Sequence, residues 1–154
     1  MRSNPKNAEL LGEATELGQF LFGTSRATLS ALRPALAAIQ DGRCFYCDAR
    51  IRDQGEVDHF VPWSKYPTDL GHNFVLADKR CNQGKSDLLA GTEHLHRWHL
   101  RNNAHEHDLS TAFDSVGLPY EMATSVNVAR WAYDLAENSH ALLFLFISVR
   151  LKRE

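Results

Sequence analysis

The chain has 154 residues, of which 44% are hydrophobic and 23% are charged, and its formal net charge at pH 7 is −2. This composition is typical of a soluble globular protein, either one ordinary domain or one small module wrapped in helices, and it allows a sizeable core. The near-neutral charge weighs against tight non-specific nucleic-acid binding by the chain alone. It leaves open a site in which a bound cation supplies the positive charge.

The sequence favours neither a membrane span nor a disulfide framework. The N-terminus, MRSNPKNAEL, is polar and lacks a secretory signal. The longest apolar run, Ala141 to Val149, is too short to cross a bilayer and predicts a buried helix. Two of the three cysteines form a Cys-x-x-Cys motif, which favours metal binding or redox chemistry in such a chain. We therefore expect a cytoplasmic protein without a membrane partner.

Two helices are predicted at the start of the chain. Residues 7–23 carry apolar residues at helical spacing. Residues 25–42 predict a second helix with Ser25 as its N-cap and Gly42 as its end. Pro34 is expected to bend or split this second helix, because proline lacks the backbone N–H that the helix interior uses.

The pattern changes at residues 43–77, where cysteines, glycines, prolines and short β-prone runs predict two or three short strands. Helical patterns then return, with breaks near 117–119 and 138–139, over residues 78–91, residues 92–102 and the C-terminal third. Thr92 is the expected cap of the helix over 92–102. The sequence therefore predicts a small strand–strand–helix insert between helical segments.

The insert contains three polar motifs in order: CFYC from Cys44 to Cys47, VDHFVPW from Val57 to Trp63, and GHNFVLADKRCNQGKSD over 71–87. In the second motif, Asp58 and His59 interrupt what otherwise reads as a buried strand. Burying either group is costly unless it is paired or bound to a metal. The pair indicates either a functional site or a structural arrangement in which Asp58 caps a turn and His59 is a hydrogen-bonded core histidine.

These residue types suit phosphodiester hydrolysis, which needs an activated water and a group that screens the phosphate charge. An imidazole is the usual general base, and Mg²⁺ needs only one or two protein oxygen ligands because it keeps several waters. Asp58 can offer a carboxylate and Asn82 an amide oxygen. His59, on the other face of the strand, can take a proton from the attacking water.

Together the three motifs resemble the HNH, or ββα-metal, endonuclease family over roughly residues 43–88. The family pattern is a Cys-x-x-Cys, an Asp-His leading into a proline, an Asn before an apolar strand, and a Cys-Asn-x-x-Lys opening a helix. The stretch NQGKSD is also similar to the corresponding helix of the HNH domain in RNA-guided CRISPR effector nucleases.

The resemblance implies an α+β fold, in which a ββα-metal motif, a short two-stranded hairpin plus a helix, is embedded in a mainly helical domain. The expected parts are an N-terminal helical segment (1–42), the HNH motif (43–90) and a C-terminal helical segment that packs on it or extends it (91–154).

The resemblance also implies the site residues. His59 would be the general base, and Asp58 and Asn82 would bind a catalytic Mg²⁺ or Mn²⁺. Asn73 corresponds to the middle residue of the family name, which orients the loop that carries the histidine, and Lys85 would contact a phosphate. Many members have a histidine at the position of Asn82, but the CRISPR domains also have asparagine there, and an amide oxygen suits Mg²⁺ or Mn²⁺ better than Zn²⁺.

A structural Zn²⁺ is the second metal that the resemblance implies. Many HNH domains hold it with two Cys-x-x-Cys pairs; here Cys44 and Cys47 form the first, and the second is reduced to Asp78-x-x-Cys81. A Cys₃Asp site is the favoured hypothesis, because Asp78 falls where the missing cysteine would be. A small unit with little core of its own gives the physical reason to expect a stabilising metal. A histidine from elsewhere could replace Asp78, or the thiols could simply be packed without a metal.

Other polar residues are interpreted as structural. His72 is taken as an exposed loop residue in preference to an extra metal ligand. Leu95, Trp98 and His99 form a helical stripe, and the neighbouring histidines are expected to face solvent. A solvated helix face explains Arg97 and Arg101 as well as a phosphate-binding patch does.

The leading hypothesis is a metal-dependent HNH endonuclease acting on DNA, with defence or restriction as a role suggested by family habit. The near-neutral charge predicts that substrate capture depends on a homodimer, a partner protein or further chain. One alternative is a non-catalytic zinc-stapled module that binds nucleic acid, although a decayed nuclease has no need for this set of polar residues. Another is thiol redox chemistry, which the turn-and-strand context of the Cys-x-x-Cys disfavours.

Overall fold

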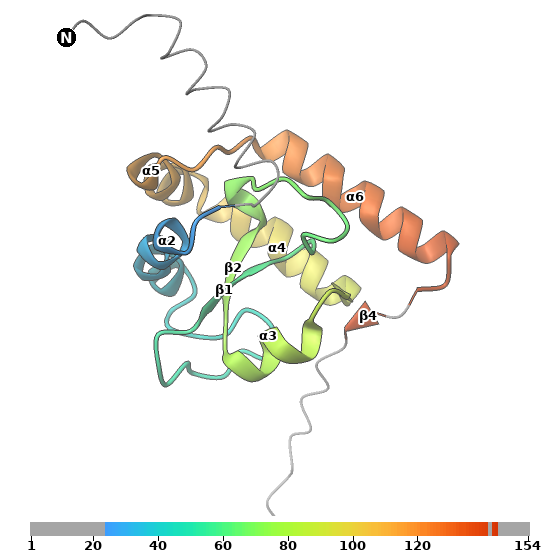
Figure 1. Ribbon diagram of the computed structural model, residues 1–154, viewed down its shortest axis with the longest axis horizontal. Coiled ribbons are helices and arrows are strands. Elements are labelled where there is room, and N and C mark those ends of the chain that lie inside the picture. The colour runs from blue at the N-terminus through green and yellow to red at the C-terminus, as the bar shows by residue number, and fades with distance from the viewer. Residues whose placement is uncertain (1–23, 142, 145–154) are drawn as a thin grey trace, which may run out of the picture.

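The computed structural model describes residues 24–141 and 143–144, and in these residues five helices surround a two-stranded antiparallel sheet (Figure 1). The helices are α2 (Arg26–Ile39), α3 (Lys79–Lys85), α4 (Thr92–Ala104), α5 (Glu106–Val116) and α6 (Met122–Asn138). The strands are β1 (Glu56–His59), β2 (Phe74–Ala77), β3 (Leu89–Ala90) and β4 (Leu143–Phe144). The predicted α+β class is confirmed. The helix expected at 7–23 lies outside the described residues.

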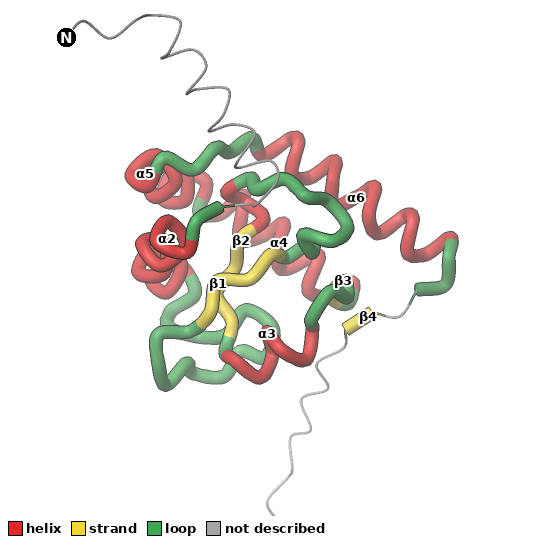
Figure 2. The backbone as a smooth tube through the Cα atoms, viewed as in Figure 1, coloured by secondary structure: helices red, strands yellow, loops and turns green. Residues whose placement is uncertain are grey.

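The ββα order is formed by β1, β2 and α3. Glu56 pairs with Ala77 at one end of the sheet, and His59 pairs with Phe74 at the other. A long connection, residues 60–73, joins the two strands and ends in the short 3₁₀ helix η1 (Gly71–Asn73), so the pair is not a tight hairpin (Figure 2). Since its residues alternate between faces, β1 presents Asp58 and His59 to opposite sides of the sheet.

The second strand divides the core between two faces, because all four of its residues are buried. On one face, Phe74 and Leu76 pack with residues of α2 and α5. On the other face, Val75 and Ala77 join a cluster that contains Phe60, Trp98 of α4 and residues of α6. Burial of each large apolar side chain stabilises the fold by about 1.5–3 kcal/mol. The sheet is thus held from both sides, with helices covering each face (Figure 1).

The predicted limits of α2 are largely confirmed. Ser25 is the N-cap, and its hydroxyl accepts the backbone N–H of Thr28 at 3.2 Å. Gly42 follows the end of the helix with a φ of +66°, a left-handed conformation that suits glycine. Pro34 does not split this helix, since the helix continues to Ile39. Pro34 is exposed, so water can hydrate the backbone carbonyl one helical turn earlier, which receives no N–H from the proline.

Helix α4 differs in detail from its prediction. Its N-cap is Gly91, and Thr92 is the first helical residue rather than the cap. His94 and Arg101 are buried, although His94 was expected to face solvent and Arg101 to lie on a solvated face or in a phosphate-binding patch. The ring of His94 donates to the Tyr46 carbonyl at 2.8 Å, and the guanidinium of Arg101 donates to backbone carbonyls of the η1–β2 segment at 2.6 and 2.9 Å. These bonds attach α4 to the sheet.

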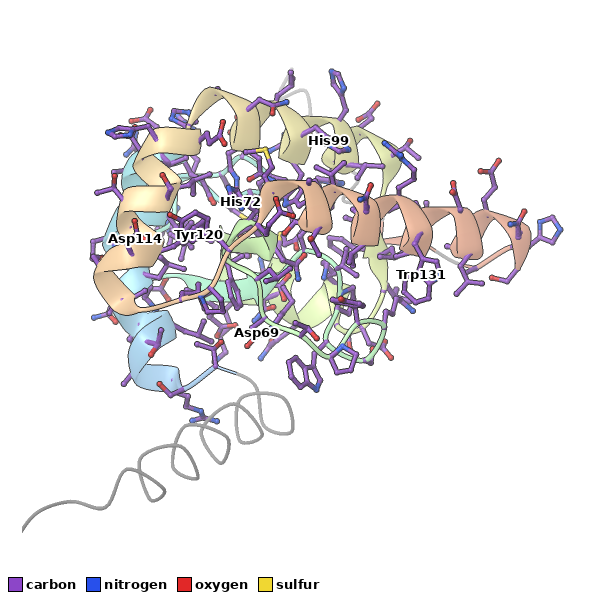
Figure 3. All side chains as sticks on the ribbon, turned by 90° about the horizontal axis from the view of Figure 1, so that it is seen from above. Asp69, His72, His99, Asp114, Tyr120 and Trp131 are labelled. Carbon is purple, nitrogen blue, oxygen red and sulfur yellow. The ribbon has the colours of Figure 1, made fainter. Side chains whose placement is uncertain are left out.

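His72 is also buried, with 1% of its surface exposed, and is not the exposed loop residue that was expected. It lies next to Tyr120 (Figure 3), with the two ring centroids 5.9 Å apart, and its carbonyl accepts the indole N–H of Trp98 at 2.8 Å. Burial, helped by the charge of Arg101, lowers the pKa of His72 to about 4 although Glu121 opposes this. The ring is therefore neutral at pH 7.

The end of the described chain corrects one prediction. The expected break at Gly117 is confirmed, since this glycine adopts a left-handed φ of +68° after α5, and α6 ends at Ser139 as expected. The helix over 141–149 is wrong where it can be checked, because Leu143–Phe144 forms a strand parallel to Leu89–Ala90. Periodicity alone does not distinguish a short apolar strand from a buried helix.

None of the helices in the described ranges is long and apolar enough to cross a membrane.

Candidate active site and metal cluster

His59 ends β1 and forms a close pair with Asp69. Its Nε2 lies 2.6 Å from Asp69 Oδ1, and the side chains are 24% and 7% exposed. The rings of Phe74 and Trp63 flank the imidazole, with ring centroids 4.8 and 6.1 Å from its own. In the neutral imidazole, the tautomer whose Nε2–H donates to the carboxylate carries its lone pair on Nδ1, as a general base requires.

Asp69 is fixed on its other side as well, since its Oδ2 accepts the backbone N–H of Thr24 at 2.6 Å. Burial alone would raise the pKa of Asp69, but the hydrogen bonds from His59 and Thr24 outweigh it and lower that pKa. In Figure 3, Asp69 lies on the side of the molecule away from His99 of α4. The sequence did not point to Asp69, because folding of the 60–73 connection brings it to His59.

Asn73 closes the loop that follows His59. Its side-chain oxygen accepts the N–H of Val61 at 2.8 Å, and its side-chain nitrogen donates to the Val61 carbonyl at 2.9 Å. The carbonyl of Asn73 also accepts the N–H of Phe60 at 2.7 Å. The two residues directly after the histidine are thus attached to Asn73 by three hydrogen bonds.

Asp58 lies on the opposite face of β1 and is 9% exposed. Its Oδ2 accepts the hydroxyl of Tyr46 at 2.6 Å and lies 3.3 Å from the ammonium of Lys85. Burial, the nearby charge of Asp58 and their hydrogen bond all raise the pKa of Tyr46, so the phenol stays protonated as a donor. Asp58 is thus a paired charge within the protein.

Lys85 is fully buried, whereas a contact with phosphate was expected of it. Its ammonium donates to the carbonyl of His59 at 2.9 Å and lies 5.7 Å from the centre of the Tyr46 ring. Burial lowers the pKa of Lys85, and the charge of Asp58 opposes that change. The helix α3 packs on β1, so this side chain reaches the strand rather than solvent.

Asn82 of α3 faces the same strand. Its side-chain nitrogen donates to Glu56 Oε2 at 2.5 Å, and Glu56 shares a face of β1 with Asp58. Oδ1 of Asp58 and the single side-chain oxygen of Asn82 accept no hydrogen bond from a described residue. Carboxylate and amide oxygens are ligand types that Mg²⁺ or Mn²⁺ prefers, so these residue types suit a hard cation. The sequence did not single out Glu56, since an acidic residue that begins a strand reads as solvent-exposed.

The cysteine motifs converge on one point. The ligand atoms of Cys44, Cys47, Asp78 and Cys81 all lie within 4.8 Å of one another, the one such grouping of three or more Cys, His, Asp or Glu found in the part of the chain described. The thiol of Cys47 donates to Asp78 Oδ2 at 3.1 Å, and the N–H of Asp78 donates to Cys44 Sγ at 3.3 Å. This cluster could hold a metal ion.

Asp78 serves two purposes in this cluster. It is the N-cap of α3, with Oδ1 accepting the N–H of Cys81 at 2.8 Å, which leaves Oδ2 facing the thiol of Cys47. Ligand atoms around a tetrahedral Zn²⁺ stand about 3.3–3.8 Å apart, so a small adjustment would bring the four into place. Burial raises the pKa of the Cys47 thiol to about 11, and it raises that of Cys81 further. Metal binding would therefore release protons.

Comparison with known proteins agrees with this geometry. Residues 44–90 match a family model described as HNH endonuclease, which covers somewhat under a third of the chain. No curated protein matched the chain significantly. The matched segment contains β1, β2, α3 and the four clustered residues. Residues 44–90 are therefore similar to the HNH endonuclease family, in agreement with the sequence motifs that resemble it.

Proposed function

We propose that this protein is a metal-dependent endonuclease that hydrolyses phosphodiester bonds of DNA, with His59 as its general base. The observation that carries the proposal is the half-buried His59, paired at 2.6 Å with Asp69 inside an HNH segment. This arrangement keeps Nδ1 free to accept a proton and places an anion where it stabilises the imidazolium. A positioned general base contributes about 10²–10⁴-fold to such a reaction.

In the proposed reaction, Nδ1 of His59 removes a proton from the water that attacks phosphorus. The new P–O bond forms as the bond to the 3′ oxygen breaks, and the leaving oxygen takes a proton from solvent. Asp69 stabilises the imidazolium until it returns its proton to solvent. Asn73 keeps the residues after His59 in place, and Lys85 holds the carbonyl of His59 from the other side. The products carry a 5′-phosphate and a 3′-hydroxyl.

A catalytic Mg²⁺ or Mn²⁺ would be held by Asp58 and Asn82, with Glu56 orienting the amide of Asn82. When bound, the cation would screen the charge of the phosphate and stabilise the leaving oxygen. Lys85 is proposed as a positioning residue for Asp58, because its buried ammonium neutralises one oxygen of that carboxylate. The direct phosphate contact first expected of Lys85 would require its side chain to leave this pairing.

A structural Zn²⁺ is proposed at Cys44, Cys47, Asp78 and Cys81. Three sulfur ligands and one carboxylate form a closed four-ligand set, as structural zinc sites require. The two strands that they adjoin have four residues each, so the local unit buries little surface without further support. We expect one zinc ion per chain by elemental analysis of the purified protein.

The direct test is cleavage of supercoiled plasmid by the purified chain in Mg²⁺ or Mn²⁺. His59→Ala should abolish cleavage, and EDTA should abolish it in the wild type. His96→Ala is the matched control, because His96 is an exposed histidine on α4, and this variant should cut as the wild type does. Cleavage by His59→Ala at the wild-type rate would refute the assignment of the base.

A second candidate, a non-catalytic zinc-stapled module that binds nucleic acid, is favoured by one observation. Asp58 is already paired with Tyr46 and Lys85, an arrangement that is stable without a catalytic cation. This candidate predicts one bound zinc and a shift of DNA on a gel, with no cleavage in Mg²⁺ or Mn²⁺. A role in phage defence or restriction, and capture of the substrate by a homodimer or partner protein, remain hypotheses within the nuclease proposal.

A further inference from the structure

A groove of about 560 Å³ adjoins the cysteine cluster and is rich in basic residues. Seven residues line it: Ala49, Arg50, Arg52, Asp53, Asp78, Lys79 and Arg80. The first four precede β1, and the last three begin α3. The groove therefore lies at the end of the sheet where Glu56 pairs with Ala77.

The four cations of this groove are available for an external anion. Arg50, Arg52, Lys79 and Arg80 are exposed, and none forms an ion pair with another described residue. The two carboxylates already have partners within the protein. Asp53 accepts the N–H of Gly55 at 2.9 Å, and Asp78 is engaged with Cys47 and Cys81. The groove is thus locally positive in a chain whose net charge is −2.

The strand β1 sets the distance along its axis between the groove and His59, the proposed general base. β1 runs from Glu56, beside the groove, to His59. At about 3.3 Å per residue the strand covers about 10 Å, which matches about three nucleotide steps along a duplex axis at about 3.4 Å per step. A phosphate about three steps from one at His59 would thus lie as far along the strand axis as the groove does.

We propose that Arg50, Arg52, Lys79 and Arg80 bind the phosphodiester backbone of the DNA substrate to one side of the scissile phosphate. This inference rests on the proposed nuclease function, and it gives the chain a capture surface of its own. The proposed contacts are made to phosphate groups and to no base edge, so they confer affinity for DNA without sequence preference.

The test measures binding separately from cleavage. All chains carry His59→Ala, and fluorescence anisotropy follows a labelled DNA duplex at several salt concentrations without added Mg²⁺. The groove variant is Arg52→Ala with Lys79→Ala. The control, Arg26→Ala with Arg130→Ala, removes two exposed cations from α2 and α6 and so changes the net charge equally.

We expect the groove variant to bind at least about tenfold more weakly at low salt. The slope of log K against log salt should fall by about two, since each lost phosphate contact removes about 0.9. The control should keep both the affinity and the slope of the parent. Equal losses in the two variants, or no DNA binding by the parent at low salt, would overturn the proposal.

Two further measurements exclude other roles for these cations. If the groove variant loses bound zinc along with affinity, the cations balance the charge of the metal cluster and the proposal fails. If polyglutamate binds the parent more tightly than DNA through the same residues, the groove serves an acidic protein and the proposal fails.

Plasmid cleavage by the chain with an intact His59 separates the groove proposal from the nuclease proposal. If that chain cleaves DNA and the groove variant binds DNA as tightly as its parent, only the groove proposal is rejected. Groove-dependent binding without cleavage rejects only the nuclease.

Discussion

Loss of one charge from the pair formed by Asp58 and Lys85 should be among the most destabilising single substitutions near the candidate site. Lys85→Met keeps most of the side-chain volume but removes an ammonium that is fully buried and 3.3 Å from Asp58. At that distance and an effective dielectric constant of about 20, the gross attraction is about 5 kcal/mol. Removing one partner of a buried pair costs about 3–5 kcal/mol, because the other charge stays buried.

The reverse change, Asp58→Asn, should cost a similar amount. It leaves the ammonium of Lys85 with only the carbonyl of His59 and the ring of Tyr46 as partners. The double variant contains neither charge, so neither is left uncompensated. We therefore expect it to be more stable than the sum of the single losses predicts, by about 2–3 kcal/mol.

Urea unfolding at pH 7, followed by circular dichroism and tryptophan fluorescence, measures this coupling. Lys79→Met is the matched control, since Lys79 is an exposed lysine on the same helix and its loss should change stability by less than about 0.5 kcal/mol. Equal losses in the free energy of unfolding for Lys85→Met and Lys79→Met would contradict the reasoning. So would a coupling energy below about 0.5 kcal/mol, because it would mean that the two charges do not depend on each other.

Three further predictions concern the base, the metal cluster and an unused histidine. Asp69→Asn should lower the single-turnover cleavage rate by about 10²-fold with little change in DNA affinity, because His59 loses its anionic partner. An unchanged rate would show that Asp69 has no part in the mechanism. Cys81→Ser should reduce the bound metal from one ion per chain to near none. EDTA should destabilise the wild type and leave the stability of this variant unchanged. Full metal content in the variant would contradict the Cys₃Asp site. His72 has a folded-state pKa of about 4. The unfolded chain therefore binds a proton below about pH 6.5 that the native protein does not, and His72 alone should reduce stability by about 2 kcal/mol between pH 7.5 and 5. His72→Phe should remove this part of the pH dependence in urea unfolding, and an unchanged dependence would show that His72 is not buried as a neutral ring.

The parts of the molecule that were predictable from sequence are those whose partners lie in short motifs. Ser25 marks a helix start because its cap bond reaches only to Thr28. The convergence of Cys44, Cys47 and Cys81 followed from two motifs whose spacing is typical of metal ligands, although their meeting point depends on the sheet.

The features that sequence did not predict depend on long-range contacts with backbone or loops. Arg101 reads as a surface cation, yet its partners are carbonyl groups, which leave no mark in the sequence. Asp69 reaches His59 only because the 60–73 connection folds back. Lys85 was expected to face a phosphate, and the packing of α3 on β1 turns it toward Asp58 instead. In each case one polar residue has two plausible environments, and only the tertiary fold selects between them.

The most direct test of the central claim is single-turnover cleavage of an end-labelled DNA duplex in Mg²⁺ by the wild type and by His59→Ala at equal zinc content. We predict cleavage by the wild type that leaves 5′-phosphate and 3′-hydroxyl ends, and a loss of at least about 10²-fold in rate for His59→Ala. Equal rates for the two proteins, or a zinc-loaded wild type that binds the duplex and does not cut it in either Mg²⁺ or Mn²⁺, would contradict the proposed function.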